Sequence, residues 1–419
     1  MPAPPLRIDL ERLRADMTEL GRIGAVPGLP GINRPSFSDE DMAARRWLMA
    51  ECHALGLRTA MDAVGNVTAR WGPADGPAVM VGSHLDSVPQ GGFFDGTLGV
   101  CAALEAVRTL KAAGLEPRTD VEIVATAEEE GRFGGMLGAQ ALCGLVDPDW
   151  FAAAHDETGI RLVDALRAQG LDPDGVEGCA RAPGEIASFL ELHIEQGPAL
   201  EAAGLEIGIV DMISGCFVWT VMLAGDANHS GTTPMDLRRD AYMGAARFAV
   251  AIPEIIARVG TAESRLTVGK IEVRPNFAHT IPGEVAFSLV GRDVDEAVMH
   301  RLAAACRVAI ADAAEAHGLA HRVEAQSWLA PVACDTDLVQ LLTAQARGLG
   351  QRAIVMPSGA GHDAQCFAQV TRAGLIFVPS VGGISHAPEE DTAWPDVARG
   401  ADLLLHALIE LAEVAGAKQ

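Results

Sequence analysis

Residues 82–100 read GSHLDSVPQGGFFDGTLGV and connect a strand to a helix. The apolar run at 79–82 predicts a short buried strand before this stretch, and residues 98–114 predict a helix after it. The loop between them carries His84 and Asp95 among glycines. Ligands of open α/β sheets bind at the carboxyl ends of strands, where His84 is expected to lie. The stretch therefore predicts an α/β fold with a chemical site at one edge of its sheet.

Three further stretches carry the same kinds of side chain. They are Glu130 in ATAEEEGRFGG (125–135), His193 in LELHIEQGP (190–198) and His386 in GGISHAPEE (382–390). Residues 121–127 predict a strand that ends at the glutamate triplet, and residues 189–194 predict another strand. Three imidazoles and two carboxylates suit two divalent cations that share one carboxylate; without thiolates, Zn²⁺, Mn²⁺, Co²⁺ and Ni²⁺ all remain possible. Such a pair activates water and polarises a carbonyl, so we expect a hydrolase of an amide-like bond.

Two acidic residues beside these ligands are expected to support the chemistry. Asp86 follows His84 by two positions, and residues two apart on a strand point the same way. We therefore expect its carboxylate to hydrogen-bond the second nitrogen of His84 and fix the tautomer of the imidazole. Glu129 is the expected general base, which takes a proton from the attacking water and passes it to the leaving nitrogen. A simple helix-capping role is the alternative for Asp95.

The order of predicted elements indicates two domains in the 419 residues. Helices at 6–22 and 38–56 and the strands above give an α/β pattern. From about 213 to 329 the pattern becomes α+β, with strands at 216–223, 265–273 and 285–290 and helices at 240–258 and 294–317. The α/β pattern then returns, with a helix at 335–348, strands at 354–356 and 375–378 and a closing helix at 395–415. We predict a catalytic domain from residues 1–212 and 330–419, interrupted by an inserted domain at 213–329.

Composition narrows the partners and the compartment. The formal net charge of −24 argues against nucleic acid or an anionic membrane as the main partner. Eight scattered cysteines without a C-x-x-C pair suggest reduced thiols. The N-terminal stretch lacks the apolar core of a signal peptide, and no uncharged apolar run reaches about 18 residues. We expect a cytoplasmic protein.

These stretches, in this order, resemble the hydantoinase/carbamoylase-type amidases of the aminoacylase-like binuclear zinc metallopeptidase superfamily. The motifs ANHSGTTPMDLRRDA (227–241) and SGAGHDAQ (358–365) belong to the same resemblance. It implies a catalytic domain with a mixed, mostly parallel sheet, interrupted by a ferredoxin-like domain that serves as lid and dimerisation domain. It also implies His84, Asp95 and His193 on one metal ion, and Asp95, Glu130 and His386 on the other, with Glu129 as base.

The resemblance adds a second group of residues that would hold a small substrate with a carboxylate. His229 matches the histidine that reaches across a homodimer to the substrate carbonyl in the partner's site. Asn276 and Arg292 match positions that hold the carboxylate, and an arginine can bind a carboxylate through two parallel hydrogen bonds. Gln196 and either Gly359 or Ala360 would complete the pocket. A surface role at a strand end is the alternative for Arg292.

We expect hydrolysis of an N-carbamoyl-L-amino acid or another ureido acid. Allantoate, 3-ureidopropionate, N-acyl amino acids and amino-acid conjugates remain alternatives, since each offers a carboxylate and a scissile C–N bond. A non-catalytic descendant would have lost a ligand or the base, and none is lost here. A barrel-type cyclic amidase would need an H-x-H motif, and the chain contains none.

Overall fold

The structure is a computed structural model that describes residues 5–72 and 76–414. Its contacts divide the chain into two compact units. Unit one contains the chain up to Asp211, Ala333–Ser358 and the chain from His362 onward. Unit two contains Met212–Val332 and the short segment Gly359–Gly361. The outermost residues of the predicted catalytic domain, 1–4 and 415–419, and residues 73–75 lie outside the described residues.

Among the described residues, nine strands form the larger sheet, in the order β1-β2-β4-β3-β5-β13-β6-β11, with β12 also paired to β6. Their bounds are β1 (Arg58–Met61), β2 (Val67–Trp71), β3 (Ala78–His84), β4 (Asp120–Thr126), β5 (Ile186–Ile194), β6 (Ile207–Ile213), β11 (Val332–Ala333), β12 (Ala353–Ser358) and β13 (Ala373–Val378). Strands β2 and β6 pair antiparallel with β4 and β13 at either side, whereas the four central strands β4, β3, β5 and β13 run parallel to one another. Their carboxyl ends therefore meet along one edge of the sheet.

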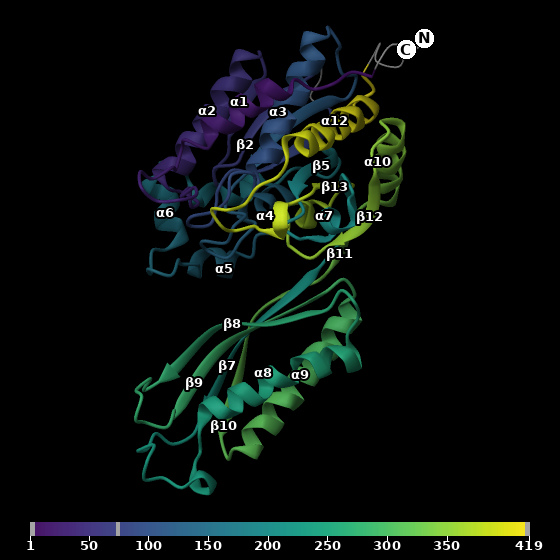
Figure 1. Cartoon of the computed structure of the whole chain (residues 1–419). Coiled ribbons are helices and arrows are strands. Elements are labelled where there is room, and N and C mark those ends of the chain that lie inside the picture. The colour runs from purple at the N-terminus through teal and green to yellow at the C-terminus, as the bar shows by residue number, and fades with distance from the viewer. Residues whose placement is uncertain (1–4, 73–75, 415–419) are drawn as a thin grey trace. The chain divides into compact units, whose positions relative to one another are not determined.

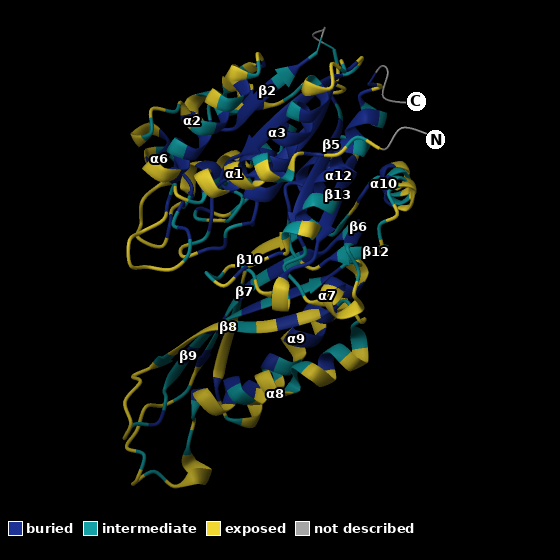
Figure 2. Cartoon of the chain, turned by 45° about the horizontal axis from the view of Figure 1, so that its top comes forward, coloured by how far each residue is buried: buried dark blue, intermediate teal, exposed yellow. Residues whose placement is uncertain are grey.

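Helices cover this sheet in unit one. They are α1 (Leu10–Leu20), α2 (Asp39–Ala54), α3 (Thr97–Ala112), α4 (Leu137–Cys143), α5 (Pro148–Ala153), α6 (Leu162–Ala168), α7 (Ala199–Ala203), α10 (Thr336–Gly348), α11 (Ala364–Phe367) and α12 (Trp394–Leu411). Helix α3 packs on β3 and β5 and α12 packs on β13 (Figure 1), and together they bury an aliphatic core (Figure 2). This burial is the main force that holds the central strands in place.

The helix boundaries follow local capping. The Ser38 hydroxyl accepts a hydrogen bond from the backbone N–H of Asp41, so α2 begins where the sequence predicts. Helix α1 begins at Leu10 rather than at residue 6, because Asp9 is its N-cap and accepts from the N–H of Arg12. Helix α12 ends at Leu411. The predicted end at residue 415 lies outside the described residues.

Unit two contains a four-stranded antiparallel sheet in the order β10-β7-β9-β8. Its elements are β7 (Gly215–Ala224), α8 (Ala241–Val259), β8 (Arg265–Arg274), β9 (Glu284–Asp293), α9 (Glu296–Ala316) and β10 (Ala320–Leu329). This β-α-β-β-α-β order is ferredoxin-like. The two helices pack on one face of the sheet, where Phe217, Trp219, Phe248 and Phe287 are buried.

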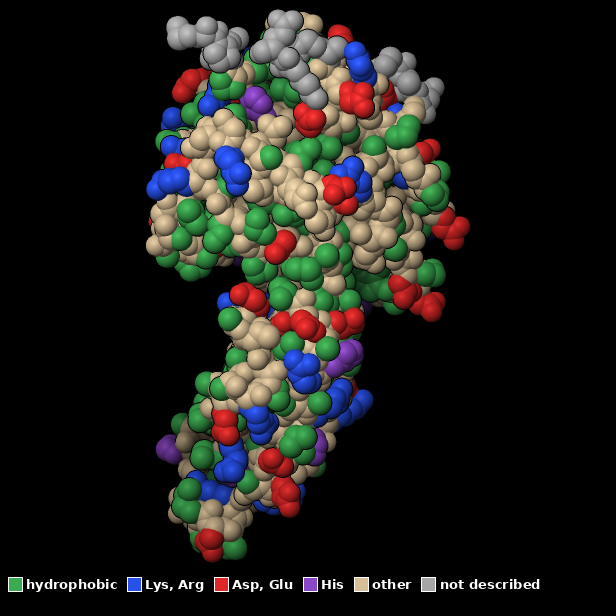
Figure 3. Space-filling view, turned by 90° about the vertical axis from the view of Figure 1, so that its right-hand side faces the viewer, with side chains coloured by type: hydrophobic (Ala, Val, Ile, Leu, Met, Phe, Trp, Pro, Cys, Tyr) green, Lys and Arg blue, Asp and Glu red, His purple; other side chains and the backbone are tan. Residues whose placement is uncertain are grey.

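The predicted fold class, a mostly parallel α/β domain with an α+β insertion, is confirmed. The sequence missed β1, β2, β6, β10 and the two-residue β11. In β10, for example, most side chains are exposed or half-buried, so the strand lacks apolar alternation. Over the described ranges, no helix is both long and apolar enough to cross a membrane. Acidic and basic side chains both occur in each unit on the face drawn in Figure 3.

Candidate metal centre

Two imidazoles face one oxygen of Asp95. His84 Nε2 lies 3.3 Å from Asp95 Oδ1, and His193 Nε2 lies 3.1 Å from the same oxygen. All three side chains are buried, and their nearest nitrogen and oxygen atoms lie within 4.8 Å of one another. This spacing suits ligands of a single cation.

A second set of ligand atoms faces the other oxygen of Asp95. His386 Nε2 lies 3.3 Å from Asp95 Oδ2 and 3.3 Å from Glu130 Oε2. The structure therefore brings together all five predicted ligands, in the two predicted sets of three, with Asp95 shared between them.

The parallel strands explain this convergence. His84 ends β3, His193 lies one residue before the end of β5, and Glu130 follows β4 after a short turn. His386 lies in the loop that follows β13. Gly96, which follows Asp95, has a φ of 61°, and a Cβ there would lie 2.4 Å from the His84 imidazole. Glycine is required at this position both by its backbone conformation and by the imidazole that packs on it.

Electrostatics at the centre reflects a crowded set of charges. Burial alone would raise the pKa of Asp95, but the three histidines, led by His193, hold it well below its usual value. The hydrogen bond to Asp95 raises the pKa of His386 to about 9. Burial, together with the nearby Asp95 carboxylate, raises the pKa of Glu130 to about 7. In the protein alone, imidazolium charge therefore compensates the buried carboxylates.

The donor set fits divalent cations. It consists of imidazole nitrogens and carboxylate oxygens that converge from strand ends and from separate loops, with no thiolate among them. Glu130 Oε1 is buried and has no hydrogen-bond partner among the described residues. A buried carboxylate oxygen without a partner is costly unless a cation binds it.

The glutamate triplet divides into three different environments. Glu129 is buried, and its Oε2 lies 3.7 Å from His84 Nε2. Burial and the adjacent Glu130 raise the pKa of Glu129 well above its usual value, and a cation in the centre would oppose this shift. The Glu128 carboxylate instead accepts from the N–H groups of Phe133 (2.6 Å) and Gly135 (3.0 Å) and thereby shapes the loop.

The predicted contact between the Asp86 carboxylate and His84 is wrong. His84 Nδ1 lies 3.0 Å from the backbone carbonyl oxygen of Asp86 instead. Strand β3 ends at His84, so the alternation of side chains does not continue to Asp86. The Asp86 carboxylate accepts from the Ser36 hydroxyl (2.9 Å) and the N–H of Glu130 (3.1 Å) and pairs with buried Arg45 at 3.8 Å. It supports the Glu130 loop rather than the imidazole.

Sequence reasoning also missed Glu191. This buried residue lies two positions before His193 on β5, so strand alternation was the signal that could have found it. With His193 and His362 it forms a third group of converging ligand atoms. Its oxygens accept from the Ser83 hydroxyl (2.7 Å) and the N–H of Ala364 (3.0 Å). Because both oxygens are used, Glu191 serves to tie β3, β5 and α11 together behind His193.

The predicted substrate residues lie in both units. In unit one, Gln196 Nε2 donates to Asp95 Oδ2 at 2.8 Å. In unit two, Arg292 Nη1 donates to the carbonyl oxygen of Gly359 at 3.2 Å, beside Ala360. His229 and Asn276 are exposed, on neighbouring loops joined by the bridge between His229 and Thr280.

These two loops lie at the opposite end of the unit-two sheet from Arg292. The loop of Asn276 connects β8 to β9, next to the paired residues Arg274 and Glu284. Arg292 is at the other end of β9. With a rise of about 3.3 Å per residue, Glu284 and Arg292 are roughly 26 Å apart. In one chain, Arg292 and Asn276 therefore do not form one pocket for a small molecule.

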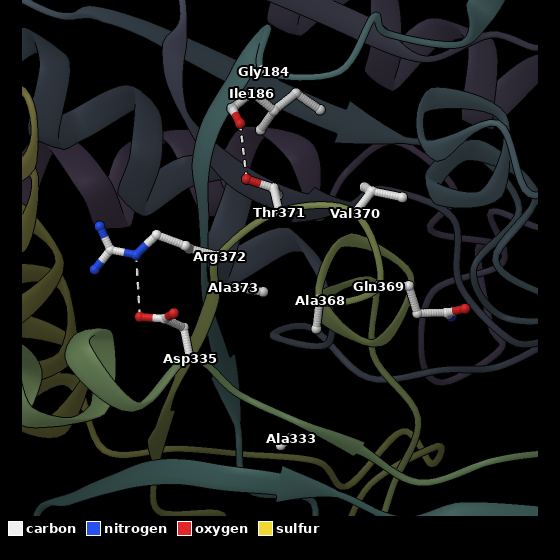
Figure 4. Close-up of a pocket in the computed structure, with 10 residues that line it drawn as sticks. All are labelled: Gly184, Ile186, Ala333, Asp335, Ala368, Gln369, Val370, Thr371, Arg372 and Ala373. Carbon is white, nitrogen blue, oxygen red and sulfur yellow. Dashed lines mark hydrogen bonds and ion pairs between the residues drawn. The ribbon is translucent and has the colours of Figure 1, made fainter.

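A separate pocket of about 500 Å³ lies in unit one (Figure 4). It surrounds the amino-terminal ends of β5 and β13, near Ile186 and Ala373. Arg372 donates to Asp335 at 3.2 Å, and the Thr371 hydroxyl donates to the Ile186 carbonyl at 2.8 Å. It contains no imidazole and lies at the opposite ends of the strands from His84 and His193. It is therefore not the ligand cluster.

Central parallel strands at whose carboxyl ends three imidazoles and two carboxylates converge are typical of a metal-dependent hydrolase. The profile of peptidase family M20/M25/M40 matches residues 80–410, and the chain belongs to this family. It is 38% identical to an N-carbamoyl-L-amino acid amidohydrolase of Geobacillus stearothermophilus, over 96% of this chain and 98% of that protein. It is 37% identical to the allantoate amidohydrolase of Escherichia coli, over 94% and 96% of the two chains.

Solved structures agree with these relatives. The crystal structure of an amidase of the hydantoinase/carbamoylase family from Burkholderia multivorans matches with a TM-score of 0.88 and 35% identity, over 98% of this chain and 99% of that one. The predicted resemblance to hydantoinase/carbamoylase-type amidases and the predicted enzyme class, an amidohydrolase of linear amides, are confirmed.

Proposed function

We propose that this protein hydrolyses the terminal C–N bond of an N-carbamoyl-L-amino acid or another ureido acid and releases ammonia. The observation that carries the proposal is the shared carboxylate of Asp95, which has two imidazoles on one of its oxygens and a third imidazole on the other. Full-length similarity to relatives named for carbamoyl and ureido substrates supports the substrate class.

Two divalent cations per subunit, Zn²⁺, Mn²⁺, Co²⁺ or Ni²⁺, would acidify the attacking water and polarise the carbamoyl carbonyl. His84, Asp95 and His193 would hold one, and Asp95, Glu130 and His386 the other. Glu129 belongs to neither set of ligand atoms but lies beside His84. We assign it the transfer of a proton from the attacking water to the leaving nitrogen.

Substrate recognition is assigned to both units. Arg292 has no carboxylate partner within ion-pair distance among the described residues, so its guanidinium is available for the carboxylate of the substrate. Gly359 and Ala360, which lie beside Arg292 in unit two, and Gln196 in unit one are assigned to substrate binding as well. His229 and Asn276 would donate hydrogen bonds to the oxygen on which negative charge develops and to the substrate carboxylate.

We further propose a homodimer in which His229 and Asn276 act in the partner's site. The separation of these residues from Arg292 supports this arrangement, because all three cannot contact one small substrate from the same chain. Strand β8 is an edge strand with an exposed Ile271, and α8 exposes Tyr242, Met243 and Val250. An apolar edge of this kind suits pairing with a second copy.

The first experiment is a substrate panel with protein reloaded with Mn²⁺ or Zn²⁺. Ammonia release would be measured for N-carbamoyl-L-amino acids, allantoate and 3-ureidopropionate, and free amino acid for N-acetyl amino acids and amino-acid conjugates. Ammonia from a carbamoyl or ureido compound supports the proposal. Turnover of an acyl conjugate alone would move the protein to the aminoacylase-like alternative.

The compartment proposed is the cytoplasm. All eight cysteines are free thiols, and burial raises the pKa of each of them because it penalises the charged thiolate. Buried free thiols are typical of proteins in reducing compartments.

A further inference from the structure

Glu390 lies four residues after His386 and is 5% exposed. Its Oε1 accepts hydrogen bonds from the backbone N–H groups of Phe94 and Asp95, both at 3.0 Å. Its Oε2 accepts from the Ser385 hydroxyl at 2.8 Å. One buried carboxylate therefore holds the backbone of the shared ligand Asp95 and the residue that precedes the ligand His386.

Ser385 extends this link to the side chain of the shared ligand. Its hydroxyl oxygen lies 3.2 Å from Asp95 Oδ2, the oxygen that faces His386. Glu390, Ser385 and the turn at Asp95 thus form one connected network between the loop after β3 and the loop after β13.

The sequence leaves room for the Glu390 carboxylate at Gly92. A Cβ at this glycine would lie 2.0 Å from Cδ and Oε1 of Glu390. Any larger residue at position 92 would push the carboxylate away from the N–H groups that it accepts from.

The two sets of ligands depend on this network to different extents. His84 and His193 lie on β3 and β5, and each Nδ1 is held by a backbone carbonyl, at 3.0 Å and 2.9 Å. His386 lies in a loop with a φ of 54°, outside any strand, so neighbouring side chains must hold its position.

We propose that Glu390 is a positioning residue that fixes the Asp95 turn against the His386 loop and so sets the affinity of the second cation position, formed by Asp95, Glu130 and His386. The inference rests on the binuclear centre of the proposed function. Groups that orient ligands in this way change metal affinity without contacting the metal.

The test is a calorimetric titration of metal-free protein with Mn²⁺. In Glu390→Gln, the amide nitrogen cannot accept from Ser385 or the backbone. We expect the weaker of the two binding steps, which we assign to the second cation position, to lose about 10- to 100-fold in affinity. The affinity of the tighter step should be unchanged. Glu389→Gln, a change at the exposed neighbouring glutamate, is the matched control and should bind like the wild type.

Gly92→Ala tests the same network without removing the carboxylate. The added methyl group should displace Glu390 and weaken the same binding step. This variant keeps the proposal testable if Glu390→Gln does not fold. Its control is Gly178→Ala, because a Cβ at Gly178 has no neighbour within 4 Å. The thermal unfolding temperature of each metal-free variant would be measured. A temperature close to that of the wild type would show that the loss of metal affinity comes from positioning and not from a general loss of structure.

The outcomes distinguish this proposal from the proposed function. If the wild type binds two ions and both variants bind two ions equally well, the role of Glu390 is refuted and the binuclear centre stands. If the wild type binds a single ion, the binuclear centre fails and the role of Glu390 fails with it.

Discussion

Oδ2 of Asp95 lies 3.3 Å from Nε2 of His386, and this contact joins the loop after β3 to the loop after β13. The other oxygen of the same carboxylate faces His84 and His193. Because the two oxygens face different imidazoles, one side chain can serve two cations.

This sharing predicts unequal effects of single substitutions. His386→Gln should leave one ion bound per chain, since His84, Asp95 and His193 remain. Asp95→Asn should weaken both positions by at least about 100-fold, because the neutral amide cannot bridge two cations. Metal content after dialysis, measured by mass spectrometry, checks both. Equal loss in the two variants would contradict a shared ligand.

Glu129→Gln should lower kcat by about 10²- to 10⁴-fold, as expected for loss of a general base. Metal content should stay at the wild-type level, because Glu129 is in neither ligand set. Steady-state assays with the substrate that the panel identifies would measure the effect. Near-normal turnover would remove Glu129 from the assigned role.

His229→Ala should abolish activity when assayed alone. Mixed with Glu129→Gln, it should regain about a quarter of wild-type activity after subunit exchange, because mixed dimers contain one site with both an intact base and the partner's histidine. Activity measured before and after exchange tests this. No recovery would mean that His229 acts within its own subunit.

Asp86→Asn should destabilise the protein, because it weakens a buried ion pair with Arg45. We expect a loss of about 3 kcal/mol in the free energy of unfolding. Ser36→Ala removes only a neutral donor to the same carboxylate and should cost about 1 kcal/mol. Urea unfolding of the metal-free proteins would compare them. Equal values would argue against the ion pair.

We expect the contribution of Asp156 to the free energy of unfolding to depend on pH. Although burial opposes it, hydrogen bonds from Thr158 and Arg132 hold the pKa of Asp156 down at about 2. A carboxyl group with a lowered pKa stabilises the fold above its unfolded pKa of about 3.9, and this contribution is lost as pH falls towards 2. Asp156→Asn should therefore be less stable than wild type at pH 7, and the gap should narrow below about pH 4.

Urea midpoints from pH 7 downward would measure this gap. The matched control is Asp164→Asn, at an exposed aspartate in the first turn of α6. A gap that stays constant with pH, or one that appears equally in the control, would contradict the assignment.

The sequence alone was sufficient to predict the central strands and the five side chains that converge beside them. Strands β3, β4 and β5 are mostly apolar runs of almost completely buried residues, and His84, His193 and Glu130 lie at or just after their carboxyl ends. In a parallel sheet, the ends of neighbouring strands must meet, so local patterns were enough to bring His84, Glu130 and His193 together.

Side-chain partners beyond those ends required the tertiary structure. The Asp86 carboxylate contacts Ser36, Arg45 and the N–H of Glu130 because β3 ends at His84. The spacing of residues in the sequence does not predict where this strand ends. Glu390 holds the Asp95 turn although the two lie far apart in the chain, and its neighbour Glu389 is exposed. Sequence periodicity reports burial along one element, whereas such contacts depend on how loops from different elements pack against each other. That packing decided which carboxylates support the centre and which only lie near it.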